Sequence, residues 1–118
     1  MMNVNSDIVS KMLEPLSKYA TLDQDGYAIA IYTTEGKVYT YKAKIEDEHE
    51  RAFSEIISNM KDPIHYIICV RGEKMTIDIP PYYPRKKLCE INEKNYKAEI
   101  VMQGMNSLCL KKMQDTLL

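Results

Sequence analysis

The stretch His65-Tyr66-Ile67-Ile68-Cys69-Val70 decides the fold class of this chain. It is a continuous apolar run, without the alternation of polar and apolar residues that marks a strand with one face in water. Such a run is typical of a strand whose two faces are both covered by helices. We therefore expect it to form the central strand of a sheet in a layered α/β protein.

Upstream of this strand, two segments rich in β-branched and aromatic residues predict a β-hairpin. They are residues 27–32 and 37–41, and residues 33–36 join them. Gly36 in the connection can adopt the positive φ that a tight turn requires. The hairpin supplies two strands to the same sheet.

Two further strands and four helices complete the predicted order of elements. Residues 75–79 and 96–102 are predicted as strands. The predicted helices, recognised by apolar residues at helical spacing, are residues 6–20, 46–60, 84–91 and 108–117. This order predicts a three-layer α/β sandwich, with a mixed sheet of about five strands and helices on both faces.

Prolines and apolar residues predict details of two of these helices. Pro15 is expected to kink or shorten the first helix, because its ring removes a backbone donor and clashes with the preceding turn. Pro84 suits the first position of the third helix, where its missing N–H would have no partner. Leu88 and Ile91 are expected to be the buried residues of that helix.

The composition matches that of an ordinary globular protein. The 118 residues are 45% hydrophobic and 28% charged, with a formal net charge of -1. A chain of this length buries about two-thirds of the surface that its unfolded form exposes, so we expect a single domain over residues 1–118. The 16 basic and 17 acidic residues leave no excess of positive charge, which argues against a dedicated nucleic-acid surface.

Cysteine usage and the N-terminal residues indicate a cytoplasmic protein. Cys69, Cys89 and Cys109 are too few and too far apart for a disulfide framework, and the chain has no Cys-x-x-Cys pair. The N-terminus lacks the basic start and apolar run of a signal peptide, and no apolar stretch approaches the roughly 18 residues of a membrane span. We therefore expect no membrane partner.

Two motifs carry a resemblance to a known family. They are Glu48-His49-Glu50-Arg51-Ala52 and Pro80-Pro81-Tyr82-Tyr83-Pro84-Arg85-Lys86-Lys87-Leu88-Cys89-Glu90-Ile91. They resemble Cys-Ala-Glu-Arg and Pro-Cys-Gly-x-Cys-Arg-Gln-x-Leu-x-Glu-Phe of the cytidine deaminase superfamily, in its small nucleoside deaminase type. The likeness covers about residues 6–118 at low identity and depends on the order and spacing of the segments. It implies a cytidine-deaminase-like fold and a homo-oligomer, a dimer or a tetramer.

The resemblance implies a zinc site, yet the ligand positions depart from the family pattern. In the family, one thiolate from the first motif and two from the second hold the zinc ion. The positions here are Glu48, Pro81 and Pro84. Proline has no donor atom in its side chain, and adjacent helix residues such as Glu48 and His49 point about 100° apart. We therefore expect no metal ligand set and no cofactor.

Glu50 is the one catalytic candidate, and only if the protein is active. The resemblance aligns it with the glutamate that moves protons during hydrolytic deamination. Without a metal it has little to activate, because a carboxylate cannot deprotonate water whose pKa is about 16. The structural interpretation is that acidic residues in a first helical turn stabilise the helix by their position.

The candidate ligand-binding residues are Glu46, Glu50, Tyr82, Tyr83 and Arg85. The resemblance aligns Glu46 with a glutamate that grips sugar hydroxyls. The two tyrosines offer aromatic faces to a base, but the segment around them is also simply a rigid connection into a helix. The basic cluster at Arg85 attracts a phosphate if it borders a pocket, and is otherwise a solvated helix face.

Three functional hypotheses follow. The first is a non-catalytic protein that binds a nucleoside or nucleotide in the remnant of a deaminase pocket. The second is a protein-interaction, immunity or regulatory protein that keeps only the scaffold. The third is an active nucleoside deaminase that hydrolyses an amino-pyrimidine with unusual metal ligands. Fold alone does not choose among them.

Overall fold

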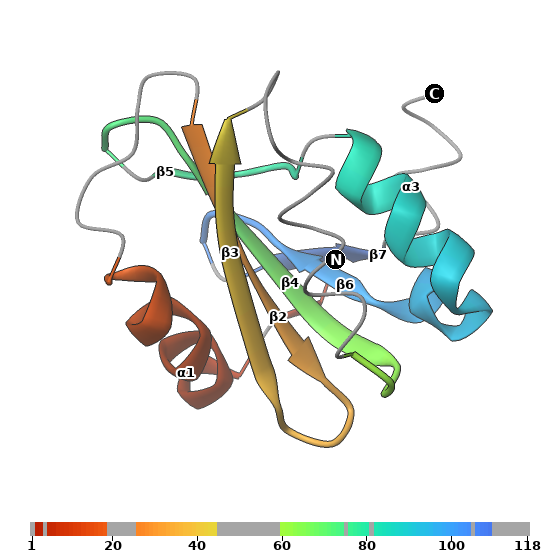
Figure 1. Ribbon diagram of the computed structural model, residues 1–118. Helices are drawn as coiled ribbons and strands as arrows, with labels where there is room; N and C mark the ends of the chain where they lie inside the picture. The colour runs from red at the N-terminus through yellow and green to blue at the C-terminus, as the bar shows by residue number, and fades with distance from the viewer. Residues whose placement is uncertain are drawn as a thin grey trace.

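The computed structural model describes residues 2–3, 5–18, 26–44, 60–74, 76–80, 82–104 and 106–109 (Figure 1). Its strands are β1 (Met2–Asn3), β2 (Gly26–Thr33), β3 (Val38–Lys44), β4 (Ile64–Arg71), β5 (Thr76–Asp78), β6 (Glu99–Val101) and β7 (Asn106–Cys109). Its helices are α1 (Ser6–Leu16), α3 (Tyr82–Ile91) and the 3₁₀ helix η1 (Glu93–Lys97). None of the described helices has the length and apolarity needed to span a lipid bilayer.

The strands form one mixed sheet in the order β1-β7-β6-β4-β2-β3, with β5 paired to β4. β2 is antiparallel to β3 and to β4, whereas β4 and β6 are parallel. The five predicted strands correspond to β2 through β6, while β1 and β7 were not predicted. The predicted hairpin is confirmed, with Gly36 at φ 84° in its turn.

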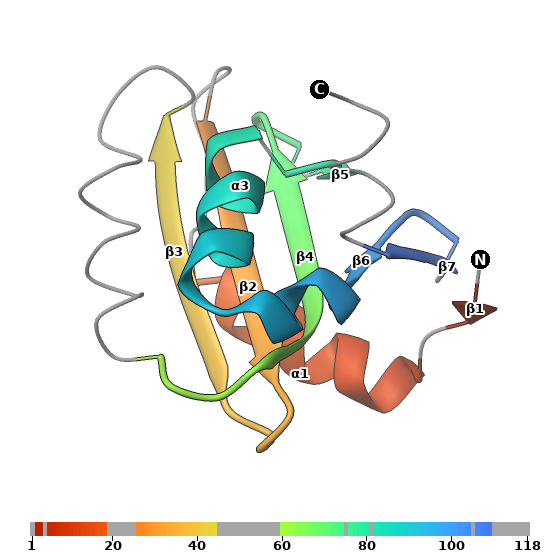
Figure 2. The same ribbon diagram turned by 90° about the vertical axis from the view of Figure 1, so that its right-hand side faces the viewer.

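Helices cover both faces of the sheet, as predicted for a three-layer sandwich. Figure 2 shows α3 in front of the sheet and α1 behind it. On the α3 side, Leu88 packs in one buried cluster with side chains such as Ile29 and Ile67. On the α1 side, Met12 packs in a second cluster with side chains such as Ala30 and Ile68. Neighbouring residues of β4 therefore enter opposite cores, which explains the unbroken apolar run.

A β-bulge interrupts the pairing of β2 with β4 at His65. Tyr32 lies opposite Tyr66 and Thr33 opposite Ile64, so His65 has no partner residue in β2. A bulge disturbs the strict alternation of faces. In agreement with this, the rings of His65 and Tyr66 stack with centroids 4.0 Å apart, although the two residues are adjacent in the strand.

The first and third helices differ from their predicted bounds. α1 ends at Leu16 rather than residue 20, with Pro15 in its last turn, which agrees with the expected shortening. α3 begins at Tyr82, two residues before Pro84. Leu88 is buried as predicted, but Ile91 is 37% exposed, because the helix ends there and the chain turns into η1.

The C-terminal elements are the main error of the sequence interpretation. Residues 96 and 97, predicted as the start of a strand, belong to η1 instead. The Oδ1 atom of Asn92 accepts the N–H of Lys94 at 2.9 Å and caps this helical turn. Leu108 and Cys109, predicted as helix, belong to β7, which pairs with β6 after a turn at Gly104, where φ is 83°. Pairing with a neighbouring strand outweighs the local helical spacing. Residues 110–117 lie outside the described residues.

Candidate functional site

The predicted site residues divide between described and undescribed parts of the chain. Glu46, Glu48, Glu50 and Pro81 lie outside the described residues, as does the predicted helix 46–60 apart from Met60. Tyr82 and Tyr83 form the first turn of α3. The structure thus locates only the α3 half of the predicted site.

The start of α3 lies at the end of the sheet where β3 and β4 finish. Figures 1 and 2 both show this arrangement, with β5 at the same end. Ligands of open α/β sheets bind outside the carboxyl ends of the parallel strands. The segment that carries Tyr82 and Tyr83 is therefore at the end of the sheet where a ligand site is expected.

Arg85 is buried, with 6% of the residue exposed. Its Nε atom donates a hydrogen bond to the carbonyl oxygen of Pro80 at 3.0 Å. The guanidinium therefore ties the start of α3 to the segment that precedes it. Arg85 was predicted as a residue that attracts a phosphate. The structure shows that it also makes a hydrogen bond to the backbone.

Arg71, the last residue of β4, was not among the predicted site residues. Its Nε and Nη2 atoms donate to the carbonyl oxygen of Ile79 at 3.0 and 2.7 Å, and its Nε atom lies 3.8 Å from Oδ2 of Asp78. The sequence gives only a weak sign of this contact, because an arginine after an apolar strand is ordinarily a solvated end residue. Only the folded chain brings Arg71 beside Ile79.

The described residues at α3 do not fit a zinc ion. Pro84, at one aligned ligand position, is buried in the helix and has no donor atom in its side chain. Cys89 is the thiol of this helix, but burial raises its pKa to about 11, and the nearby Cys109 adds to the rise. Zinc binds the thiolate, which that pKa disfavours. Within the described segments, no three His, Cys, Asp or Glu side chains are grouped to hold a metal.

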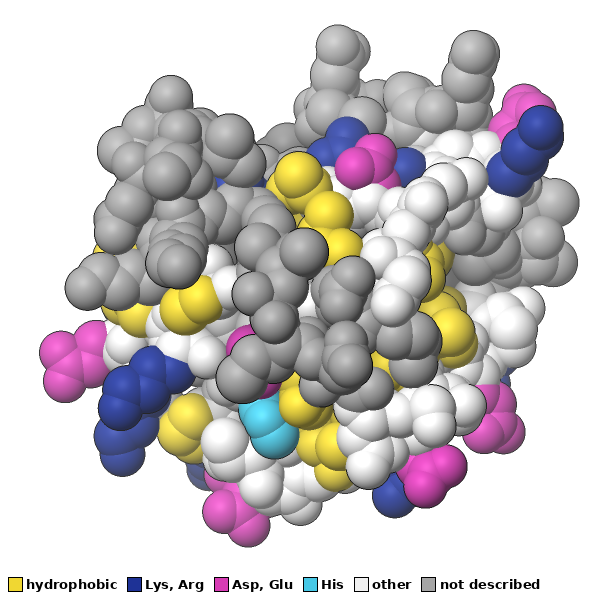
Figure 3. All heavy atoms as spheres, turned by 180° about the vertical axis from the view of Figure 1, so that it is seen from behind, with side chains coloured by type: hydrophobic (Ala, Val, Ile, Leu, Met, Phe, Trp, Pro, Cys, Tyr) yellow, Lys and Arg dark blue, Asp and Glu magenta, His cyan; other side chains and the backbone are white. Residues whose placement is uncertain are grey.

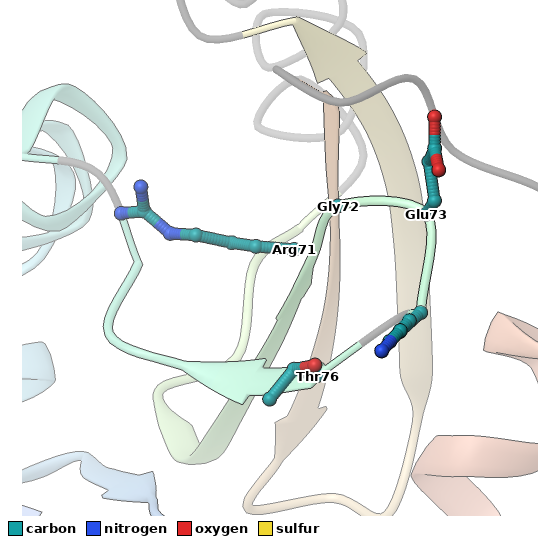
Figure 4. A pocket seen from close by; sticks show the side chains of 5 residues that line it. Arg71, Gly72, Glu73 and Thr76 are labelled. Atoms are coloured by element: carbon teal, nitrogen blue, oxygen red, sulfur yellow. The ribbon is translucent and has the colours of Figure 1, made fainter.

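A shallow cavity lies at the turn between β4 and β5. It has a volume of about 380 Å³ and is lined by Arg71, Gly72, Glu73, Lys74 and Thr76. In Figure 4 the side chain of Arg71 extends to the left, away from the turn, whereas the side chain of Glu73 points upward. Gly72 has φ 73°, and its N–H donates to the carbonyl oxygen of Gly26 at 3.0 Å, so the turn is fixed to the start of β2.

A second polar cluster lies at the amino ends of β4 and β6. The Oγ atom of Ser107 donates to Oε1 of Glu99 at 2.8 Å, and Nε2 of His65 lies 4.0 Å from Oε2 of Glu99. Figure 3 shows a histidine beside hydrophobic side chains on this back face. In a catalytic triad the serine hydroxyl donates to a histidine base, and the histidine donates to a carboxylate. Here the hydroxyl of Ser107 donates directly to the carboxylate of Glu99, so the cluster is not arranged as a triad.

Comparison with solved structures identifies the fold. The cytidine deaminase from Mycobacterium leprae superposes with a TM-score of 0.65, covering 94% of this chain and 98% of that chain at 12% sequence identity. This chain has the cytidine deaminase fold. A point mutant of the cytidine deaminase from Mycobacterium tuberculosis gives a TM-score of 0.57, with 75% of each chain covered at 17% identity.

The cytidine deaminase fold was predicted from the two motifs, and that prediction is confirmed. No protein-family model matches the chain, and no curated protein matches it in sequence. At identities of 12% and 17%, the likeness to the solved enzymes concerns the path of the chain alone. The chemistry of this protein has to be argued from its own residues.

Proposed function

We propose that this protein is a non-catalytic relative of the cytidine deaminases that binds a nucleoside or nucleotide beside the start of α3. The observation that supports the proposal is Pro84, which is buried in α3. The motif resemblance aligns this proline with a thiolate of the family pattern. Hydrolytic deamination by this family needs a water molecule activated by zinc. With proline at a ligand position, that activation has no support from α3.

Binding without catalysis uses the residues that do not depend on a metal. Tyr82 and Tyr83 begin α3, and aromatic side chains stack on bases with little dependence on the base. Glu46 and Glu50 are the proposed partners of the sugar hydroxyls and the base. The ammonium of Lys74, at the cavity beside Arg71, is available to a nucleotide phosphate.

The test is a ligand-dependent shift in stability of the full chain. Cytidine, uridine and their monophosphates are added to the purified protein, and unfolding is followed by thermal denaturation. A ligand at a hundred times its dissociation constant adds ~2.7 kcal/mol to the free energy of unfolding. Tyr82→Ala and Tyr83→Ala are expected to remove the shift. Tyr96→Ala, which changes a 40% exposed tyrosine in η1, is the matched control and is expected to retain it.

Catalysis is tested separately by the release of ammonia from cytidine. We expect no release of ammonia, with or without added zinc, from either the native chain or the Glu50→Gln variant. Stoichiometric zinc in the purified protein, together with deamination that Glu50→Gln abolishes, would establish an enzyme instead. A protein that no nucleoside or nucleotide stabilises would contradict the binding function itself.

A second candidate, an interaction, immunity or regulatory protein, is favoured by exposed apolar side chains. Among the described residues, the exposed large hydrophobic ones are Ile91 and Tyr96, 37% and 40% exposed, and both lie where α3 passes into η1. Exposed apolar patches mark protein contact sites, so these two side chains are the first to test. A specific partner that binds the native chain and not the Ile91→Asp, Tyr96→Asp double variant would favour this function over nucleoside binding.

We also propose that the chain self-associates as a dimer or tetramer in the cytoplasm. The proposal rests on the resemblance to small deaminases. Light scattering coupled to gel filtration measures the mass directly. A monomer at all concentrations would contradict it.

A further inference from the structure

Two arginines from different elements hold consecutive carbonyl groups in the segment that enters α3. Arg71, at the end of β4, donates two hydrogen bonds to the carbonyl oxygen of Ile79, at 3.0 and 2.7 Å. Arg85, in α3, donates one to the carbonyl oxygen of Pro80 at 3.0 Å. The strand and the helix are thus tied to adjacent residues of the segment between them.

The surroundings strengthen these contacts. Asp78 places Oδ2 3.8 Å from Nε of Arg71, and its Oδ1 accepts the N–H of Ile79 at 2.7 Å. Both backbone groups of Ile79 are therefore engaged. Arg85 is 6% exposed, so its hydrogen bond is shielded from water. Hydrogen bonds from charged donors are shorter and stronger than neutral ones.

The segment needs such ties because it is rich in proline. β5 ends at Asp78, and neither Pro80, Pro81 nor Pro84 has an N–H group to donate. Carbonyl oxygens are the backbone groups that remain available, and guanidinium groups are donors without acceptor capacity. Donation from arginine to carbonyl is the pairing that this sequence permits.

We propose that Arg71 and Arg85 form an arginine clamp that fixes the backbone of Ile79 and Pro80 without a metal and thereby positions the start of α3, which carries Tyr82 and Tyr83. The clamp takes the place, at this segment, of the metal that the zinc motif of the deaminases would supply. The described residues of α3 do not fit zinc, so the segment relies on side-chain donors instead. This inference concerns the ligand-free protein and holds whether or not the protein binds a nucleoside.

The experiment measures local opening of the segment by limited proteolysis with chymotrypsin. Cleavage after Tyr82 reports on the segment, because the bond between Tyr83 and Pro84 resists the protease. Cleavage after the exposed Tyr96 serves as the internal reference in the same mass-spectrometric assay. Arg71→Ala and Arg85→Ala are expected to raise the rate after Tyr82 by about ten- to a hundredfold, as expected for a lost charged hydrogen bond. Lys61→Ala, which removes an exposed cation just before β4, is the matched control.

Two further arms separate the clamp from a general loss of stability and from a metal. Added guanidinium chloride, below denaturing concentrations, is expected to slow cleavage of Arg71→Ala again, whereas sodium chloride does not. Treatment of the native chain with 1,10-phenanthroline is expected to leave cleavage and melting temperature unchanged. If Arg85→Ala fails to fold, Arg71→Ala decides alone, because that side chain is 30% exposed. Unchanged cleavage in Arg71→Ala, or faster cleavage of the native chain after chelation, overturns the proposal.

Discussion

Asn95 joins three elements through a single buried side chain. It lies in η1 with 1% of its surface exposed, its Oδ1 accepts the N–H of Ile64 at 2.9 Å, and its Nδ2 donates to the carbonyl oxygen of Leu88 at 2.8 Å. The bonds tie η1 to the start of β4 and to α3. The asparagine amide suits this position because it has both an acceptor for the N–H of Ile64 and a donor for the carbonyl of Leu88.

Asn95→Ala is expected to lower the free energy of unfolding by about 2–4 kcal/mol. The substitution leaves a backbone donor and a backbone acceptor without partners in a buried place, and each such loss costs about 1–3 kcal/mol. Denaturant unfolding measures the change. Gln103→Ala, which removes an exposed amide that donates to the carbonyl oxygen of Ile77 at 3.1 Å, is the control and is expected to cost less than about 0.5 kcal/mol. Equal effects of the two would show that Asn95 is not a structural link.

At the scale of elements, α1 shows how a local signal and a tertiary face combine. Asn5 caps the helix, because its Oδ1 accepts the N–H of Asp7 at 2.8 Å and of Ile8 at 3.4 Å. Val9, Met12 and Leu16 are its buried face. The cap sets where the helix begins, and the apolar face sets which side of the sheet it covers.

Asn5→Ala is expected to destabilise the protein by about 1 kcal/mol, the usual cost of a lost helix N-cap. Asn5→Asp keeps an accepting oxygen at the same place and is expected to cost little. Both are measured by denaturant unfolding. A cost that is the same for alanine and aspartate would mean that the contact seen at Asn5 does not support the helix.

At the scale of the whole molecule, the two cores meet at β4. The buried side chains of this strand therefore become exposed to water when the whole protein unfolds. Cys69 is fully buried on the α3 side of this strand. Burial raises the pKa of its thiol from 9.0 to about 12. The folded protein therefore keeps the thiol proton at pH values where the unfolded chain releases it.

This difference predicts a loss of stability in alkaline solution. The contribution of Cys69 is fully present below pH 9 and falls as the pH rises from about 9 towards 12, because a raised pKa in the folded state favours folding only while the thiol is protonated. The slope approaches about 1.4 kcal/mol per pH unit for one fully buried thiol. Unfolding is measured from pH 8 to 10, which spans about one unit on either side of the pKa of 9.0 of the unfolded thiol. A reducing agent is present throughout. Cys69→Ala is expected to flatten the curve, and identical slopes would contradict the prediction.

The sequence by itself determined the layered fold and which segments form its centre. The apolar run of β4, the hairpin of β2 and β3 and the apolar face of α1 each carry their signal within a few residues, because periodicity and turn chemistry are local. It also supplied the family motifs, whose fold the solved deaminases confirm. These signals needed no knowledge of distant contacts.

Only the tertiary structure decided the features that depend on partners far along the chain. β7 is a strand because β6 lies beside it, although its local pattern favoured a helix. Arg71 reaches Ile79, and Asn95 reaches Ile64 and Leu88, across elements that the sequence could not place side by side. Hydrogen bonds of this kind form only where distant segments of the chain lie close together after folding. No local pattern of residues predicts which segments these are.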